Sequence, residues 1–182
     1  MEACANLSRH AAPKMIFPGS IVRVSKDSPT TVFTNSSHVV LTPQDSMFYQ
    51  WYLNGFTFDR CIISAAVPDA EHLNTGNKSY AASGDLGSIE VWNVSYPDSR
   101  MRQLSWVQKP SRIALLGTLN FTHRDQLDMW QLQPPTPRFD CPDGRYTVEI
   151  ACNACRIELE QVFSMPAMGM FFVISKRVRA SD

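Results

Sequence analysis

Five cysteines are the side chains in this sequence with the clearest capacity for covalent chemistry: Cys4, Cys61, Cys141, Cys152 and Cys155. Cys152 and Cys155 form a C-x-x-C pair, a spacing found in zinc sites, in redox-active dithiols and in loop disulfides. A zinc site needs four ligands, and the sequence offers no second C-x-x-C or H-x-x-x-H to complete one. A redox pair is typical of a helix N-terminus in an α/β fold, which this sequence does not predict. We therefore expect no metal site, and we interpret Cys152 and Cys155 as either a loop disulfide or two unreactive thiols.

Two other cysteines are placed to connect distant parts of the chain. Cys61 opens one expected strand and Cys141 precedes another, so a bond between them would join two elements. Such a bond would close a loop of about eighty residues and contribute a few kcal/mol. Cys4 is left without a partner in this arrangement.

Conventional catalytic motifs are missing from the sequence. There is no G-x-S-x-G nucleophile elbow, no phosphate-binding glycine loop and no H-E-x-x-H. Four histidines are scattered among polar or turn-forming neighbours, which is more typical of structural or solvent-facing residues than of catalysis: His10, His38, His72 and His123. No residue set supports a hydrolase or a metalloenzyme, and we expect no cofactor.

Three carboxylates near the C-terminus, Glu149, Glu158 and Glu160, fall in two neighbouring alternating runs. We expect these runs to be the two strands of one hairpin. Beside Arg145 and Arg156, the three glutamates are then interpreted as an exposed charged face rather than as paired catalytic acids.

Aromatic and sulfur-containing side chains are the remaining candidates for a binding site. In the strand expected around residues 48–52, Tyr49 and Trp51 point to one face and Phe48 and Tyr52 to the other. Two apolar faces on one strand predict a second burial surface besides the core, either a ligand pocket or a subunit interface. Flat aromatic walls beside adaptable methionines suit an apolar small molecule, and the alternative is ordinary core packing. The candidate wall residues are Trp51, Trp92, Trp106, Trp130, Met165, Met168 and Phe171.

Five N-glycosylation sequons stand out against the roughly one that chance would supply. Their acceptor residues are Asn6, Asn35, Asn77, Asn93 and Asn120. The excess favours passage through the secretory pathway, while the alternative is that Asn, Ser and Thr are common in β turns.

Composition and charge narrow the class of protein. The chain has 182 residues, 44% of them hydrophobic and 19% charged, with seventeen basic and seventeen acidic residues. These values are typical of one globular domain, and zero net charge gives no electrostatic reason to expect a nucleic-acid partner. No apolar stretch approaches the roughly 20 residues that span a bilayer.

Residues near the N-terminus bear on whether the protein is exported. No signal peptide is visible in residues 1–14, and residues 15–24 are interrupted by Pro18 and Gly19. We expect a removed signal and a secreted or secretory-pathway protein, with the cytoplasm as the alternative. We place a loose segment at 1–14, one domain at 15–176 and a tail at 177–182.

Strand-forming segments cover most of that domain. They are rich in Val, Ile, Phe, Tyr, Trp and Thr, and Pro, Asp, Gly and Ser clusters separate them. Two segments, 88–94 and 146–152, alternate between two faces with period two. About ten strands and very little helix predict an all-β fold, an antiparallel β-sandwich or flattened barrel. The expected segments are 15–24, 31–41, 48–56, 61–67, 88–95, 112–121, 128–133, 146–152, 156–163 and 170–176, and residues 124–131 are compatible with a short helical turn.

Several short motifs, taken in order, resemble a fungal family. They are Ile16-Phe17-Pro18, Arg60-Cys61-Ile62-Ile63, Val67-Pro68, Tyr80 with Ser83-Gly84-Asp85-Leu86-Gly87-Ser88-Ile89, and Phe139-Asp140-Cys141-Pro142-Asp143-Gly144 with Val148-Glu149-Ile150. The chain is similar over residues 15–176 to the ubiquitin-3-binding-protein C-terminal domain family, whose members are common in fungi, often follow signal peptides and mostly have no assigned activity.

The resemblance implies two kinds of function. One is a fungal secondary-metabolism pericyclase, such as a hetero-Diels–Alderase that joins a quinone methide to a terpene inside an apolar site. Holding two partners in reactive geometry can lower a barrier by up to roughly 7–11 kcal/mol without a nucleophile or metal, and the expected hydrogen-bond donors to an electron-poor carbonyl are Tyr49, Tyr52 and Arg112, with Trp51 beside them. The other is a non-enzymatic secreted or cell-surface module for an unidentified partner. If the second burial surface is a subunit interface rather than a ligand pocket, we expect a homo-oligomer that associates through an aromatic face.

Overall fold

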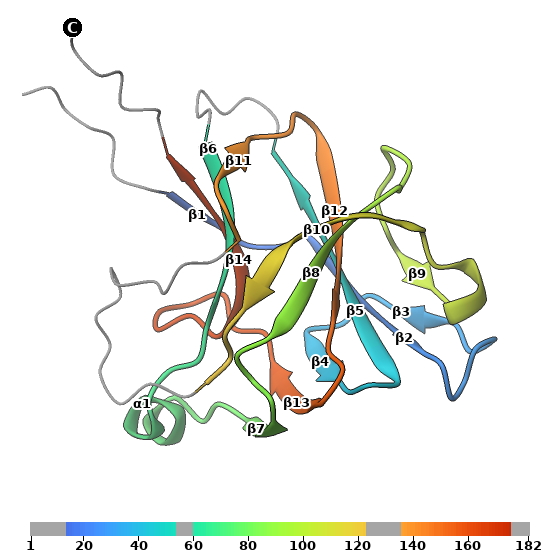
Figure 1. Cartoon of the computed structure of the whole chain (residues 1–182). Coiled ribbons are helices and arrows are strands. Elements are labelled where there is room, and N and C mark those ends of the chain that lie inside the picture. Colours follow the sequence, from blue (N-terminus) through green and yellow to red (C-terminus); the bar gives the residue numbers. More distant parts are fainter. Residues whose placement is uncertain (1–13, 54–59, 123–135, 176–182) are drawn as a thin grey trace, which may run out of the picture.

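A computed structural model describes residues 14–53, 60–122 and 136–175 and shows an all-β protein (Figure 1). Fourteen strands form four sheets, and every strand pairing is antiparallel. Helix within these residues is limited to α1 (Ala70–Thr75) and the 3₁₀ turn η1 (Trp106–Gln108). The all-β fold class with very little helix is therefore confirmed.

The largest sheet has five strands and carries most of the candidate site. Its order is β10 (Arg112–Leu119), β8 (Ile89–Val94), β12 (Arg145–Ala151), β5 (Asp45–Tyr52) and β2 (Ser20–Ser25). The central strand β12 sets Val148 opposite Tyr49 of β5 and Asn93 of β8. Strands β12 and β5 are buried on both faces over most of their length, as expected of strands with a neighbour on each side and a covering layer above and below.

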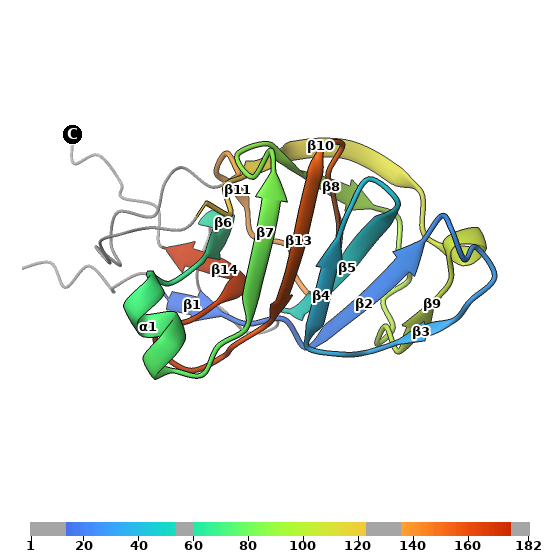
Figure 2. The same cartoon turned by 90° about the horizontal axis from the view of Figure 1, so that it is seen from below.

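Three smaller sheets complete the molecule. The four-stranded sheet runs β1 (Lys14–Ile16), β14 (Gly169–Ser175), β6 (Arg60–Ala66) and β11 (Phe139–Asp140). The three-stranded sheet runs β4 (His38–Leu41), β13 (Cys155–Glu160) and β7 (Tyr80–Gly84), which lie side by side in Figure 2. Strands β3 (Phe33–Thr34) and β9 (Gln103–Leu104) form a two-stranded ribbon.

The main core lies between one face of the five-stranded sheet and the four- and three-stranded sheets. Trp51 of β5 meets Phe172 of β14 edge to face, with ring centroids 4.7 Å apart, and both side chains are fully buried. Such aromatic pairs add about 0.5–1.5 kcal/mol to the burial of their area. We call the face of the five-stranded sheet that points into this core the inner face, and the opposite one the outer face.

Several expected strands are interrupted or supplemented. The segment 15–24 is two strands in different sheets, because the chain turns at Pro18 and Gly19, and proline supplies no amide hydrogen to a ladder. The segment 31–41 is likewise divided into β3 and β4. Strands β7, β9 and β11 and helix α1 were not predicted. Asp69 is the N-cap residue that precedes α1, and its side chain accepts a hydrogen bond from the His72 amide at 2.8 Å. The strand expected at 128–133 and the turn expected at 124–131 lie outside the described residues.

The hairpin expected from residues 146 to 163 is wrong. Strand β12 already has β5 and β8 as its two neighbours, so β13 joins a different sheet, between β4 and β7. The expectation that Glu149 belongs to an exposed charged face fails with it, because the Glu149 side chain is completely buried. Glu158 and Glu160 do lie at a partly exposed surface, on β13.

Candidate functional site

Both pairs of cysteines expected near one another form disulfides. Cys61 of β6 is bonded to Cys141, directly after β11, which confirms the expected link between two elements. Cys152 and Cys155 are also bonded, so of the two alternatives left by the sequence the loop disulfide is correct. Cys4 lies outside the described residues. Among the residues that are described, no group of three or more His, Cys, Asp or Glu side chains is placed to hold a metal ion.

Three of the expected site residues belong to the main core. Tyr49 and Trp51 stack with ring centroids 5.8 Å apart, and both are fully buried with Met168. The Trp51 indole donates a hydrogen bond to the Ile16 carbonyl at 3.1 Å. The Tyr49 hydroxyl is buried without a partner among the described residues, and burial raises the pKa of this phenol. Tyr49 therefore stays neutral and inside the core.

Three further candidates, Tyr52, Met165 and Phe171, differ from one another in exposure. Tyr52 and Met165 are more than half exposed. The guanidinium carbon of Arg145 lies 4.8 Å from the centre of the Tyr52 ring. Phe171 is buried on the face of β14 opposite to that of Phe172, with its ring 6.3 Å from that of Phe17. Trp130 lies outside the described residues.

The outer face of the five-stranded sheet is the second burial surface that the Phe48–Tyr52 strand predicts. A separate cluster of buried side chains covers part of it: Val22, Val24, Phe48, Val94, Met101 and Leu104. The residues that cover it, Met101 and Leu104 with Tyr96 and Trp106, belong to the chain's own segment 96–111. Gln50 of β5 binds this segment, because its side-chain amide accepts a hydrogen bond from the Met101 N–H and donates one to the Ser99 carbonyl, both at 2.9 Å. This part of the outer face is therefore core packing, and not the ligand pocket or subunit interface that the sequence predicted.

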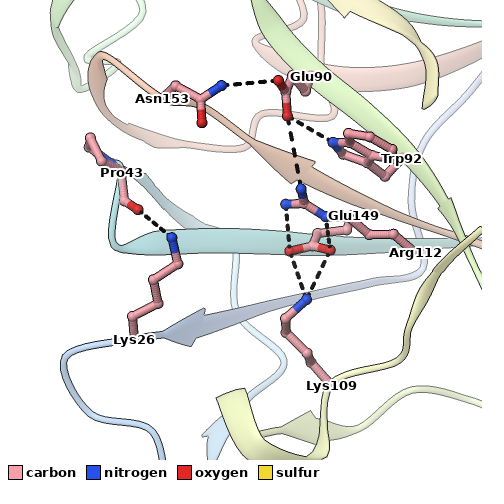
Figure 3. A network of polar contacts seen from close by, with 8 residues as sticks. All are labelled: Lys26, Pro43, Glu90, Trp92, Lys109, Arg112, Glu149 and Asn153. Atoms are coloured by element: carbon pink, nitrogen blue, oxygen red, sulfur yellow. Dashed lines mark hydrogen bonds and ion pairs between the residues drawn. The ribbon is translucent and has the colours of Figure 1, made fainter. Parts of the chain in front are cut away.

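Beside this cover, the outer face gathers charged and aromatic side chains. Figure 3 draws Glu90 and Trp92 of β8, Arg112 of β10, Glu149 of β12, and Lys109, which directly follows η1. We call this group the aromatic–ion patch. It consists of Phe48, Glu90, Trp92, Trp106, Lys109, Arg112 and Glu149. Three of its members, Trp92, Trp106 and Arg112, are site residues expected from the sequence.

Glu149 is the centre of the patch. On the central strand it sits opposite Phe48 of β5 and Trp92 of β8, and its side chain has no solvent exposure. Arg112 binds it in a bidentate fork, with Nε–Oε2 at 2.8 Å and Nη2–Oε1 at 3.2 Å. Lys109 approaches from another side, with Nζ at 3.3 and 3.4 Å from the two oxygens. A carboxylate buried at this depth is tolerated because two cations and four short contacts replace its water.

Arg112 is held from a second direction by Trp92 and Glu90. Its guanidinium carbon lies 4.8 Å from the centre of the Trp92 ring, a cation–π distance, and its Nη1 lies 4.0 Å from Glu90. The Glu90 carboxylate accepts from the Trp92 indole at 2.9 Å and from Asn153 at 3.0 Å. The Trp92 ring and the guanidinium are therefore kept in one relative orientation.

Trp106 is the aromatic counterpart at the other end of the patch. The Lys109 ammonium lies 4.9 Å from its ring centre, and the Lys26 ammonium lies 5.3 Å from it. Lys26 also donates to the Pro43 carbonyl at 3.1 Å. Lys109 thus connects Trp106 to Glu149, as Arg112 connects Trp92 to Glu149.

The chemistry of the patch follows from this pairing. The four charged side chains of the patch, two glutamates, one arginine and one lysine, have a net charge of zero. Moving Arg112 or Lys109 away would leave the buried Glu149 carboxylate with fewer partners, which is unfavourable. The Arg112 and Lys109 side chains keep 34% and 19% exposure, and each cation lies against the ring of one tryptophan, Trp92 for Arg112 and Trp106 for Lys109. Such an arrangement suits a flat, largely apolar molecule with a carbonyl oxygen.

Sequence reasoning missed Glu149 and Lys109 as members of the site. A signal was present for Glu149, because it lies in a run whose other face, Val148 and Ile150, is fully apolar. Lys109 precedes Pro110 in a loop, and no motif or periodic pattern in the sequence indicates that it belongs to a site.

The expected glycosylation acceptors within the described residues differ in exposure. Asn35 and Asn77 are exposed, whereas Asn93 and Asn120 are half-buried. The side-chain oxygen of Asn35 accepts a hydrogen bond from the Ile21 N–H at 2.6 Å. The side-chain oxygen of Asn120 accepts one from the backbone amide of Thr122 at 2.7 Å. Asn93 is in β8, with a paired strand on each side.

Across the described residues, no helix combines the length and the apolar character needed to cross a membrane.

Comparison with known families and with curated proteins finds no family model and no curated protein that matches this chain.

Proposed function

We propose that this protein binds an apolar, carbonyl-bearing small molecule at the aromatic–ion patch and promotes its hetero-Diels–Alder cyclisation in fungal secondary metabolism. The observation that carries the proposal is the fixed position of Arg112 between Trp92 and the buried Glu149. The indoles of Trp92 and Trp106 serve as walls, and Arg112 and Lys109 serve as donors.

The proposed mechanism needs positioning rather than covalent catalysis. A quinone methide stacked on an indole presents its carbonyl oxygen to the guanidinium of Arg112 or to the ammonium of Lys109. A hydrogen bond from a cation draws electron density out of the heterodiene, and a donor that is already oriented does this without reorganisation. The terpene alkene is held beside the quinone methide and reacts with it. Proximity and orientation of the two reactants lower the barrier to this reaction.

The proposed setting is the secretory pathway. Disulfides persist in oxidising compartments and are rare in the cytosol, and this chain has two of them. The sequon excess agrees with this setting.

A second candidate is a binding module without catalytic activity. It is favoured by the engagement of both cations with Glu149, which reduces the charge that Arg112 and Lys109 can offer to a developing anion.

The test uses a quinone methide generated in solution together with a terpene alkene, and it measures product ratio and enantiomeric excess. With the parent protein we expect one stereoisomer in excess over the uncatalysed mixture. Trp92→Leu and Trp106→Leu should each reduce the selective rate about tenfold or more, equivalent to about 1.4 kcal/mol, with little change in Tm.

Tyr52→Leu is the matched control, because Tyr52 is an exposed aromatic residue of the same sheet outside the patch. It should behave as the parent does. Saturable binding of the quinone methide precursor without any change in product distribution would select the binding module. If the two tryptophan variants and the control all matched the parent in binding and in rate, the patch would not be the site.

A further inference from the structure

The turn between β12 and β13 contains the C-x-x-C pair, which the proposed function does not use. Cys152 and Cys155 are bonded to each other and buried, whereas the two residues between them, Asn153 and Ala154, are exposed. The Ala154 carbonyl accepts a hydrogen bond from the Asp85 amide at 2.9 Å. The turn is therefore closed by a covalent bond and also attached to the chain that follows β7.

Strand register places Asn153 beside Glu90 of the aromatic–ion patch. Ala151, the last residue of β12, pairs with Glu90 of β8, and Asn153 follows two residues later. The side-chain amide of Asn153 donates a hydrogen bond to Oε1 of Glu90 at 3.0 Å. The other carboxylate oxygen, Oε2, accepts from the Trp92 indole at 2.9 Å. Figure 3 shows Glu90 between the two side chains, with one oxygen for each.

The orientation of the Trp92 ring depends on how Glu90 is held. A carboxylate with a donor at each oxygen has a fixed direction, because both hydrogen bonds are charge-assisted. The remaining contact of this carboxylate, to Nη1 of Arg112, is 4.0 Å long and does not fix its direction. The Glu90 side chain is 23% exposed, so without the amide of Asn153 its Oε1 turns to water. The acceptor of the Trp92 N–H then loses its fixed position.

We propose that Asn153 is a positioning residue of the aromatic–ion patch, which fixes Glu90 and, through Glu90, the orientation of the Trp92 ring. The Cys152–Cys155 disulfide contributes to the same role, because it closes the turn that carries Asn153. The consequence for the reaction rests on the proposed function. A wall with a single orientation presents one face of a stacked ligand to the second reactant, so Asn153 affects the stereochemical outcome more than it affects binding.

The first test measures Trp92 in the full chain without any ligand. Its indole N–H resonance is assigned in a two-dimensional NMR spectrum with the variant Trp92→Phe. In Asn153→Ala this resonance should shift, and its N–H should exchange with water about threefold faster or more, since the hydrogen bond that is lost lies one step from the indole. Asn153→Asp should have the larger effect, because a second carboxylate beside Glu90 repels it.

Ala154→Ser is the matched control, because Ala154 is exposed in the same turn and its side chain is one methyl group. The Trp92 resonance and its exchange rate should match those of the parent in this variant. A Trp92 indole that responds equally to all three substitutions in the turn, or to none of them, overturns the proposal.

Replacement of Cys152 and Cys155 together by alanine tests the part of the disulfide, at a temperature well below the Tm of the variant. The Trp92 N–H should exchange faster, as it does in Asn153→Ala. Adding Asn153→Ala to this variant should have little further effect, because both changes act through one contact and are not additive. Fully additive effects would overturn the role of the disulfide.

The reaction of the quinone methide with the terpene alkene measures the consequence separately. In Asn153→Ala the ratio of the two enantiomers should fall about threefold or more, while binding of the quinone methide precursor changes little. If the parent gives no stereochemical excess, the proposed function fails, and the Trp92 resonance still decides the role of Asn153. If the parent gives an excess that Asn153→Ala leaves intact, the role of Asn153 in the reaction is overturned and the proposed function stands.

Discussion

Glu149 couples three parts of the protein that are separate in the sequence. It lies on the central strand β12, and its carboxylate binds Arg112 of the edge strand β10 and Lys109 of the segment that covers the outer face. Removing its charge leaves two cations beside a buried, neutral amide. The cost of losing one partner of a buried ion pair exceeds what the intact pair contributes, because the remaining charge stays desolvated.

We therefore expect Glu149→Gln to lower the free energy of unfolding by about 3 kcal/mol, at the lower end of the range for broken buried pairs, since Arg112 and Lys109 retain partial access to water. Glu158→Gln is the matched control, because Glu158 has His38 and Arg156 as neighbours at 3.5 and 3.9 Å but its side chain is 43% exposed. The control should change the free energy of unfolding by less than about 0.5 kcal/mol. Urea denaturation of the disulfide-intact proteins measures both values, and equal effects of the two substitutions would contradict the central role of Glu149.

The tyrosines expected to act together as donors have different surroundings. Tyr49 is buried in the main core, and Tyr52 is exposed at the end of the same strand. Burial also raises the pKa of Tyr80 and of Tyr146 to about 12. The hydroxyls of Tyr49, Tyr80 and Tyr146 therefore remain protonated at neutral pH.

At the scale of elements, the two disulfides constrain loops of very different length. Cys61–Cys141 spans 80 residues and connects β6 to the chain that leads into β12, whereas Cys152–Cys155 spans three and closes the turn between β12 and β13. In the loop-entropy description, the longer closure restricts the unfolded chain more strongly.

Replacing Cys61 and Cys141 together by alanine should lower the free energy of unfolding by about 4 kcal/mol, and the same replacement of Cys152 and Cys155 should lower it by about 2 kcal/mol. The short-loop variant is the control for the loss of two sulfur atoms from a buried site. Guanidinium denaturation gives the values, and non-reducing peptide mapping verifies which bond remains in each variant. The reverse order of stability would show that native packing, rather than loop closure, decides the effect.

At the scale of the whole molecule, the four sequons within the described residues lie at different depths. Asn35 and Asn77 are exposed, and Asn77 has φ 47°, in a turn just after α1. Asn93 is half-buried in the middle of a sheet. An attached sugar needs solvent beyond the amide, so these positions are not equivalent acceptors.

Expressed with an export signal in a fungal host, the protein should carry glycans at Asn35 and Asn77, with lower occupancy at the half-buried Asn93 and Asn120. Intact mass before and after glycosidase treatment, followed by peptide mapping, measures the occupancy of each site. Asn77→Gln should remove one glycan without changing Tm. A mass that glycosidase leaves unchanged would contradict the proposed secretory setting.

Local patterns in the sequence determined the all-β fold class. The Cys61–Cys141 bond was also predicted, whereas the sequence left Cys152 and Cys155 as either bonded or free, and the structure decided that they are bonded. Alternation with period two is a property of consecutive residues, so segments such as 88–94 and 146–152 are recognisable without knowledge of their neighbours. The apolar character of both faces around residues 48–52 similarly indicated a second burial surface, which the cluster around Phe48 and Met101 forms.

Only the tertiary structure decided which strands are neighbours and what covers each face. Glu149 was expected at a surface because β12 was paired with β13 in a hairpin, and its burial follows from the actual neighbours β5 and β8 and from the cover supplied by residues 96–111. Likewise, Trp92 and Arg112 meet whereas Trp51 and Phe171 point into different layers. Strand pairing and layer packing join residues far apart in the chain, and a local pattern states that a face is apolar without stating which distant segment will cover it.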